Sequence, residues 1–228
     1  MELEAINLAL FKVLNASADL SGPLLVLAKV AARDLIDALI AILVLNWLFG
    51  NERDRHALPL VVFAALLSLA LNYLVAQGFP HPRPFMIGVG HTFVSHRAES
   101  GFPSDHASPM WTIALGMLLW SHRKWIGWFA VALAAATSWA RVFIGVHFPF
   151  DILGSMAVAA ASVGALVALQ PLIERVVASP IEAWYVRVGL GRIGGYPARL
   201  CGLFRDATRR SAKPDATPNS TGNQSSEP

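Results

Sequence analysis

The sequence predicts an all-α fold, a polytopic membrane bundle of five transmembrane helices preceded by an amphipathic helix. Two observations predict this class. Of the 228 residues, 55% are hydrophobic and only 14% are charged, whereas soluble domains carry about 25% charged residues. The apolar residues also form several runs with few or no charges, long enough to cross a bilayer as helices of about 20 residues. The chain is therefore expected to be an integral membrane protein.

An amphipathic pattern opens the chain. Ile6, Leu10, Val13 and Leu14 fall on one face of a helix, and polar residues fall on the other. A helix with one apolar and one polar face is typical of the membrane surface. Residues 1 to 20 are therefore expected to form an interfacial helix.

The membrane core is expected over residues 21 to 171, and its first span, which ends at Phe49, holds charges at membrane depth. Charges inside a bilayer are costly unless they are paired or face a polar cavity. Arg33 and Asp37 are four residues apart on a helix, which predicts an ion pair between them. The alternative is that Arg33 faces inward, toward a reaction centre.

Four further apolar runs follow, at about residues 57 to 77, 104 to 121, 125 to 140 and 152 to 170. Successive spans alternate in direction, and most basic residues fall in the connections on one side. By the positive-inside rule that side faces the cytoplasm. The long polar connection at 79 to 103 and the hairpin at 141 to 151 are therefore expected on the outer face.

Beyond the core, residues 172 to 205 mix apolar and basic residues and are expected to form an interfacial basic helix, with a sixth span around 179 to 204 as the alternative. Residues 206 to 228 are rich in Pro, Ser, Thr and Asn, which predicts disorder. The single cysteine, Cys201, excludes an intramolecular disulfide and a cysteine-based metal cluster. The net charge of +3 suits anionic membrane lipids better than nucleic acid.

The hairpin at 141 to 151 carries three ionisable side chains between two spans. His147 and Asp151 are four residues apart, and Pro149 suits the first position of a helix, so Asp151 can reach back to the imidazole. A carboxylate that binds one ring nitrogen leaves the other free as a nucleophile or base. Arg141 adds a planar cation suited to phosphate oxygens. The alternative is a cluster that only anchors the helix ends.

Two further polar segments are expected on the same membrane face. Arg83 lies between two prolines, whose stiff backbone suits a clamp, although a turn carrying a solvated arginine is equally common. Ser104 suits an N-cap, and a helix N-terminus is a ready anion site. His106 would point at that anion, although alone it would be an incidental polar residue. Jointly these residues predict a phosphate site.

Three motifs in this order resemble the signature of the type 2 phosphatidic acid phosphatase superfamily, whose usual forms are K-x6-R-P, P-S-G-H and S-R-x5-H-x3-D. The corresponding residues here are Arg83-Pro84, Pro103-Ser104-Asp105-His106 and Arg141-x5-His147-x3-Asp151. Within this superfamily, the bacterial undecaprenyl diphosphate phosphatases of the bacitracin-resistance type are the subgroup that the sequence most resembles. The segments that carry this resemblance are F-P-H-P-R-P-F and W-A-R-V-F-I-G-V-H-F-P-F-D.

The resemblance implies an enzyme of the bacterial inner membrane that acts outside the cytoplasm without metal or other cofactor. His147 would attack the terminal phosphorus of undecaprenyl diphosphate, and Asp151 would fix the tautomer of its ring. His106 would protonate the leaving oxygen and then activate the hydrolytic water. The product would be the recycled lipid carrier of cell-wall synthesis. The phosphate-binding residues would be Arg83, Arg141, Ser104 and Asp105.

The sequence also departs from the superfamily's pattern. Ala76 stands where the superfamily has its motif lysine, Ala140 replaces the serine before Arg141, and Asp105 replaces the glycine. The residues that could replace the missing lysine are Arg33, His81 and Arg97.

The same residues are compatible with other functions, and the sequence does not determine the oligomeric state. Within the superfamily, the alternatives are a phosphotransferase that acts on lipid A and a phosphatase for phosphatidic acid or phosphatidylglycerol phosphate. From a different class, the alternative is a small membrane transporter or scaffold, which would carry charges at bilayer depth on several helices.

Overall fold

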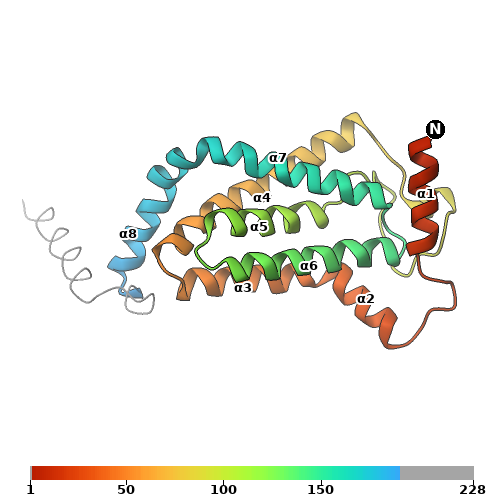
Figure 1. Cartoon of the computed structure of the whole chain (residues 1–228), viewed down its shortest axis with the longest axis horizontal. Coiled ribbons are helices and arrows are strands. Elements are labelled where there is room, and N and C mark those ends of the chain that lie inside the picture. Colours follow the sequence, from red (N-terminus) through yellow and green to blue (C-terminus); the bar gives the residue numbers. More distant parts are fainter. Residues whose placement is uncertain (1, 191–228) are drawn as a thin grey trace, which may run out of the picture.

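The computed structural model describes residues 2–190, and this part of the chain consists of helices and the loops between them. Its α-helices are α1 (Glu2–Leu14), α2 (Pro23–Arg33), α3 (Leu35–Phe49), α4 (Glu52–Gly78), α5 (Ala107–Trp120), α6 (Lys124–Phe143), α7 (Pro149–Ile173) and α8 (Ser179–Arg187). A 3-10 helix, η1 (Pro84–Ile87), and a π-helix, η2 (Glu174–Ala178), complete the list. Helices α3 to α7 lie side by side along the long axis, and α1 lies across one end (Figure 1). The predicted all-α class is confirmed.

Helix α5 occupies the middle of the bundle and packs against α4, α6 and α7. Small and flexible residues let these helices approach closely: Ala114, Gly116 and Met117 are all buried. A Cβ added at Gly116 would lie 3.0 Å from Cγ2 of Val61 on α4, so a larger residue would push the two helices apart. The central position of α5 places the residues that precede it at the middle of one end of the bundle.

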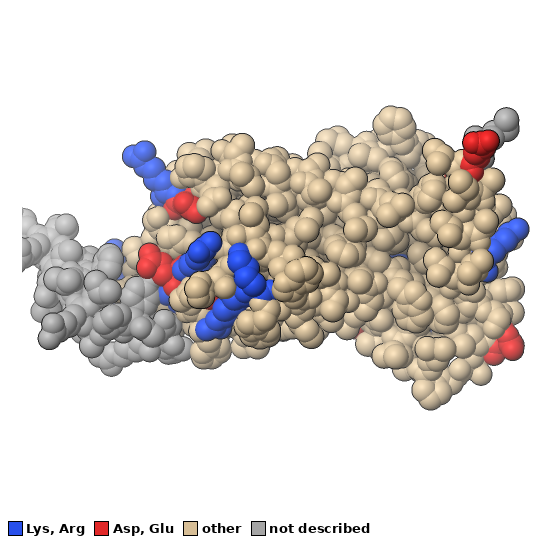
Figure 2. Space-filling model, viewed as in Figure 1, with Lys and Arg blue, Asp and Glu red and all other residues tan. Residues whose placement is uncertain are grey.

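Long apolar helices identify the chain as a multi-pass membrane protein. Within the described residues, α4, α6 and the continuous helical stretch Pro149–Arg187 are long and apolar enough to cross a bilayer, while α3 and α5 are apolar but shorter. On the face shown in Figure 2, the charged side chains gather toward the two ends and leave a broad uncharged band between them. The total of five spans stays a prediction, because α3 and α5 are shorter than a usual span.

The predicted first span is interrupted at Asp34. Helix α2 ends at Arg33, α3 begins at Leu35, and α2 diverges from the bundle (Figure 1). The predicted ion pair between Arg33 and Asp37 is wrong. Nε of Arg33 instead lies 3.7 Å from Oδ1 of the neighbouring Asp34, with the two side chains 88% and 52% exposed. The break removes the helical spacing on which the prediction depended.

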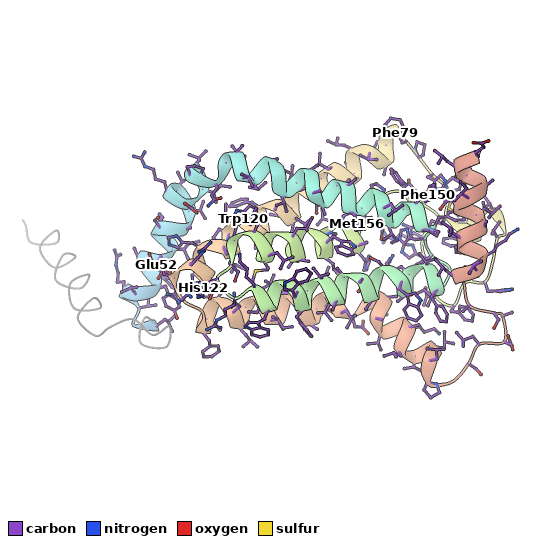
Figure 3. All side chains as sticks on the ribbon, in the orientation of Figure 1. Glu52, Phe79, Trp120, His122, Phe150 and Met156 are labelled. Carbon is purple, nitrogen blue, oxygen red and sulfur yellow. The ribbon has the colours of Figure 1, made fainter. Side chains whose placement is uncertain are left out.

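The end of the bundle away from α1 is tied together by buried charges. Asp54 accepts hydrogen bonds from the hydroxyl of Ser121 at 2.6 Å and lies 3.5 Å from Nε of Arg123, which joins the start of α4 to the α5–α6 connection. Nε of Arg55 donates to Glu182 of α8 at 2.7 Å. Glu52, Trp120 and His122 mark this end in Figure 3, far from Phe79 and Phe150 at the other.

Helix α1 confirms the predicted N-terminal amphipathic helix, with Leu10 and Val13 on its exposed side. Its opposite side packs on the 141 to 151 hairpin. The ring of Phe11 meets that of Phe148 edge-on with centroids 5.0 Å apart, and Oδ1 of Asn7 accepts the backbone N–H of Phe150 at 3.0 Å. Helix α1 therefore lies directly against the segment that carries the candidate chemistry.

Helix α7 runs on through η2 into α8, so residues 172 to 187 continue the path of the last apolar helix (Figure 1). The rest of the predicted interfacial segment, including Cys201, lies outside the described residues. The same holds for most of the alternative sixth span and for the predicted disordered tail at 206 to 228.

Candidate active site

Three segments that are distant in sequence meet at the α1 end of the bundle. They are the connection between α4 and α5, the residues just before α5, and the hairpin between α6 and α7. His147 of the hairpin is fully buried at their junction. Its ring nitrogens lie within hydrogen-bonding distance of Arg83, Ser104, Arg141 and Asp151. The structure therefore brings together the two arginines, the serine, the histidine and the carboxylate that the sequence singled out.

The contacts of His147 fix its tautomer. Nε2 lies 3.0 Å from Nη1 of Arg83 and 3.1 Å from Nη2 of Arg141. A guanidinium can only donate hydrogen bonds, so Nε2 must carry the lone pair. The proton is then on Nδ1, which donates to the carbonyl of Gly101 at 2.9 Å and lies 3.3 Å from Oδ2 of Asp151. The ring presents an unprotonated Nε2 to the donors around it.

The ring of His147 is also neutral near pH 7. Its complete burial, together with the positive charges of Arg141 and Arg83, lowers its pKa to about 3, although the hydrogen bond with Asp151 acts in the opposite direction. A neutral imidazole with a free lone pair needs no base to activate it as a nucleophile.

Asp151 is held by the start of α7. Pro149 occupies the first turn of that helix, and Oδ2 of Asp151 accepts the backbone N–H of Phe148 at 2.8 Å. Gly101 allows the carboxylate to sit this close, because a Cβ there would lie 3.2 Å from Oδ2 of Asp151 and 3.0 Å from Cγ of Arg83. The four-residue spacing between His147 and Asp151 predicted this contact, whereas nothing in the sequence indicated the role of Gly101.

The two arginines are anchored by carbonyl groups rather than by carboxylates. Nε and Nη2 of Arg83 donate to the carbonyls of Glu99 and Ser100, both at 3.1 Å. Nη1 of Arg141 donates to the carbonyl of Ala32 at 3.1 Å. Within residues 2–190, neither arginine forms an ion pair, and the buried Nε of Arg141 has no hydrogen-bond partner. Two neighbouring cations that are not paired with a carboxylate can bind an anion.

Helix α5 begins at Ala107, slightly later than Ser104 predicted. The hydroxyl of Ser104 still accepts the backbone N–H of Ala107 at 3.4 Å, and it lies 3.2 Å from Nε2 of His147. Ser104 therefore contacts both the helix start and the candidate nucleophile.

Asp105 is exposed and is held from another helix. Nδ2 of Asn72 on α4 donates to Oδ1 of Asp105 at 3.1 Å, and Oδ1 of the same Asn72 accepts the hydroxyl hydrogen of Ser108 at 3.0 Å. This link ties α4 to the start of α5, and it gives the carboxylate a partner that the sequence pattern did not indicate.

A cavity of about 430 Å³ lies between α2, residues 94 to 96 and the start of α5. Its polar lining consists of Lys29, Arg33, Asp34, Ser95, His96, His106 and Arg141, and its apolar lining includes Val26, Val30, Val94, Ile144 and Val146. Burial lowers the pKa of His106 to about 4, and the charges of Arg141, His96 and Arg83 contribute. A bound anion would oppose these charges and raise the pKa of His106 again.

The three residues expected to replace the missing lysine lie in different places. Arg33 lines the cavity. Arg97 is exposed, and its carbonyl lies 3.3 Å from Nδ1 of His96. His81 lies behind Asp151, with Nδ1 3.4 Å from Oδ1 of that carboxylate. Lys29, which the sequence interpretation did not single out, lines the same cavity as Arg33. Lys29 and Arg33 are four residues apart on one helix, and this spacing was the signal that could have identified Lys29.

Within residues 2–190, no group of three or more His, Cys, Asp or Glu side chains is arranged to hold a metal ion.

Comparison with known families decides the assignment. Residues 57–175, just over half of the chain, match the family model described as the PAP2 superfamily. The chain belongs to the PAP2 superfamily. The match spans α4 to η2 and includes all three motifs, so the resemblance inferred from those motifs is confirmed.

Relatives within the PAP2 superfamily agree with the subgroup inferred from the sequence. The chain is 38% identical over 154 residues to YbjG of Escherichia coli (strain K12), provisionally named an undecaprenyl-diphosphatase, which covers 68% of this chain and 77% of YbjG. It is 38% identical over 118 residues to the undecaprenyl-diphosphatase BcrC of Bacillus subtilis (strain 168), which covers 52% of this chain and 60% of BcrC.

A solved structure supports the fold. The transmembrane PAP2 type phosphatidylglycerolphosphate phosphatase of Bacillus subtilis superposes with a TM-score of 0.55 at 20% identity. The aligned region covers 77% of this chain and 89% of that one. At this identity the likeness establishes the shared PAP2 architecture.

Proposed function

We propose that this PAP2 protein is a membrane phosphatase that hydrolyses undecaprenyl diphosphate to undecaprenyl phosphate and inorganic phosphate. The observation that carries this proposal is the neutral Nε2 of His147, surrounded by Arg83, Arg141 and Ser104. One lone pair cannot satisfy three donors at once, so these groups retain capacity to bind phosphate oxygens. The substrate follows from two relatives, each 38% identical, whose names give undecaprenyl diphosphate as theirs.

In the first step, Nε2 of His147 attacks the terminal phosphorus, and the bond from that phosphorus to the bridging oxygen breaks. The bridging oxygen leaves with undecaprenyl phosphate and takes a proton from His106. The Nδ1 proton stays on the ring, held by the Gly101 carbonyl and Asp151, so the carboxylate stabilises the imidazolium formed. Binding of the anionic diphosphate supplies the rise in the pKa of His106 that this role requires.

In the second step, a water molecule gives a proton to His106 and attacks the phosphorus. The bond between phosphorus and Nε2 breaks, its electron pair returns to His147, and inorganic phosphate leaves. In both steps Arg83, Arg141 and Ser104 bind the oxygens on which charge collects.

We assign the second phosphate and the lipid chain to the cavity beside α2. Arg141, which contacts His147, lines this cavity together with His106, and Lys29 and Arg33 of α2 line it as well. Lys29 and Arg33 would thus supply the cation that is missing at Ala76. The apolar lining, including Val26 and Val30, suits the first units of a prenyl chain.

The double substitution Lys29→Met/Arg33→Met is expected to lower kcat/KM for undecaprenyl diphosphate about tenfold, because exposed charge contacts contribute modestly. It is expected to change kcat/KM for a monophosphate lipid less than about twofold, because that lipid has no second phosphate to bind. The matched control is Lys12→Met/Arg97→Met, which removes two exposed cations that do not line the cavity. Equal losses on both lipids would contradict the assignment of the second phosphate.

The direct test of function is release of inorganic phosphate by the purified protein from separate lipids: undecaprenyl diphosphate, phosphatidic acid and phosphatidylglycerol phosphate. Undecaprenyl diphosphate is expected to be hydrolysed fastest, without an added acceptor. Phosphate loss from the diphosphate only in the presence of lipid A would instead establish a phosphotransferase.

We propose further that the protein lies in the bacterial inner membrane with the His147 end outside the cytoplasm, because Arg53, Arg55, Arg123 and Lys124 gather at the opposite end. In a Cys201→Ser background, a membrane-impermeant maleimide added to sealed right-side-out vesicles is expected to label Ala98→Cys. His122→Cys should become labelled only after the vesicles are opened. The reverse labelling pattern would invert the proposed orientation.

A further inference from the structure

His81 touches the catalytic group from the side opposite the substrate cavity. Its Nδ1 lies 3.4 Å from Oδ1 of Asp151, and its Nε2 lies 3.6 Å from a carboxylate oxygen of Glu4 on α1. Its ring also meets that of Phe148 edge-on, with centroids 5.6 Å apart. His81 therefore stands between helix α1 and the carboxylate that orients the nucleophile.

The two oxygens of Asp151 have different surroundings. Oδ2 accepts the N–H of Phe148 and contacts Nδ1 of His147. Within residues 2–190, Oδ1 of Asp151 and Nδ1 of His81 are both buried, and neither has a hydrogen-bond partner. Leaving a buried carboxylate oxygen unpaired is costly, so a small movement that closes the 3.4 Å gap would satisfy both atoms.

Charge favours this pairing. The groups that face His81 are Glu4 from α1 and Asp151 from α7, with His147 beyond the carboxylate. The pairing with Asp151, assisted by Glu4, raises the pKa of His81 above its usual value although burial opposes the shift. His81 can therefore donate from Nδ1 to Asp151 and from Nε2 to Glu4 at the same time.

We propose that His81 is a positioning residue that acts through Asp151. By holding Oδ1, it keeps Oδ2 directed at Nδ1 of His147, and Glu4 holds His81 in turn. The contacts Glu4, His81, Asp151 and His147 then form one continuous chain. The seating of α1 on the hairpin is thereby coupled to the orientation of the nucleophile.

This assignment differs in a measurable way from a phosphate-binding role for His81. A residue that binds the substrate changes KM, whereas a residue that orients the nucleophile changes kcat. His81 lines a separate cavity of about 360 Å³ with Glu4, Asn7 and Phe150, and that cavity is not the one that His106 and Arg141 line. The structure therefore favours an effect on kcat.

The test compares His81→Gln with His91→Gln, a control at an exposed residue of the same connection. His81→Gln is expected to lower kcat about tenfold with KM unchanged, because a misplacement of about 1 Å can cost about 10²-fold and the loss of Oδ1 support should move the ring by less than that. His91→Gln is expected to match the wild type. A raised KM with normal kcat would place His81 on the substrate, and an unchanged kcat would also overturn the proposal.

A pH profile adds a readout that a packing role would not change. Because the pKa of His81 is raised by its pairing, the ion pair is complete below pH 6.5 and is lost as the pH rises through the raised pKa. The wild-type kcat should therefore fall over that alkaline range. The kcat of His81→Gln should be flat there, and an alkaline fall that persists in this variant would refute the assignment.

Glu4→Gln keeps the proposal testable if His81→Gln does not fold, because Glu4 is exposed on α1. This variant is expected to move the alkaline fall to lower pH, and an unmoved fall would count against the coupling to α1. This inference rests on the proposed function only in that the protein must hydrolyse a phosphate lipid. The kcat and pH measurements can therefore use any phosphate lipid that the wild type hydrolyses. Failure on undecaprenyl diphosphate alone would therefore overturn the proposed substrate without deciding the role of His81.

Discussion

The variant His147→Gln is expected to lower kcat/KM for undecaprenyl diphosphate by more than about 10⁴-fold, since removing the nucleophile of an enzyme with a covalent intermediate costs about 10⁶-fold. Glutamine is close to histidine in volume, and its amide oxygen can accept hydrogen bonds from Arg83 and Arg141. The buried site should therefore stay packed while its nucleophile is lost. The measurement is inorganic phosphate released by the purified variant.

The control for this prediction is a histidine at the other end of the molecule. His122→Gln changes an exposed side chain and is expected to retain wild-type activity. Thermal unfolding of both variants in the same detergent would establish that His147→Gln is folded. Phosphate release by a folded His147→Gln variant at more than about a hundredth of the wild-type rate would contradict the nucleophile assignment.

The second large effect is expected from Arg141. Arg141→Met should lower kcat/KM by about 10² to 10³-fold, the usual cost of removing one donor that stabilises charge in the transition state. Arg141→Lys should restore only part of this loss, because an ammonium cannot reproduce the planar fork that faces both Nε2 of His147 and the Ala32 carbonyl.

Ligand-dependent stability separates binding from catalysis at Arg141. On the proposed function, inorganic phosphate binds the folded state, so it should raise the Tm of the wild type and should raise the Tm of Arg141→Met much less. Without phosphate the variant should be no less stable, because it removes one of two neighbouring buried cations that lack a carboxylate partner. Arg97→Met is the matched control, and an equal loss of activity there would show that the effect is not specific to Arg141.

Much of this architecture could be predicted from the sequence because its signals are local. Long apolar runs define the helices of the bundle, and the spacing between His147 and Asp151 determines their contact within one helical turn. The rule that successive spans alternate in direction is enough to place Arg83 and Ser104 at the same end of the bundle as His147. Each of these inferences depends on neighbouring residues or on counting spans.

The remaining features depend on contacts between distant segments, which leave no local pattern. Residues on both sides of Asp34 have the composition of one continuous span, so the break between α2 and α3 was not visible in the sequence. Likewise, His81 is close to Arg83 in sequence, but its direction is set by Glu4 and Asp151. The partner of Asp105, Asn72, belongs to a different helix.

On the proposed function, the break at Asp34 bears on how a lipid reaches His147. Helix α2 diverges from the bundle, and its Val26 and Val30 line the cavity and are exposed, as are Leu24 and Leu27 on the same helix. On the proposed function, the prenyl tail stays in hydrocarbon throughout the catalytic cycle, and only its headgroup travels sideways to His147. Encounter is then a two-dimensional search within one leaflet, and the surface density of the lipid sets its rate.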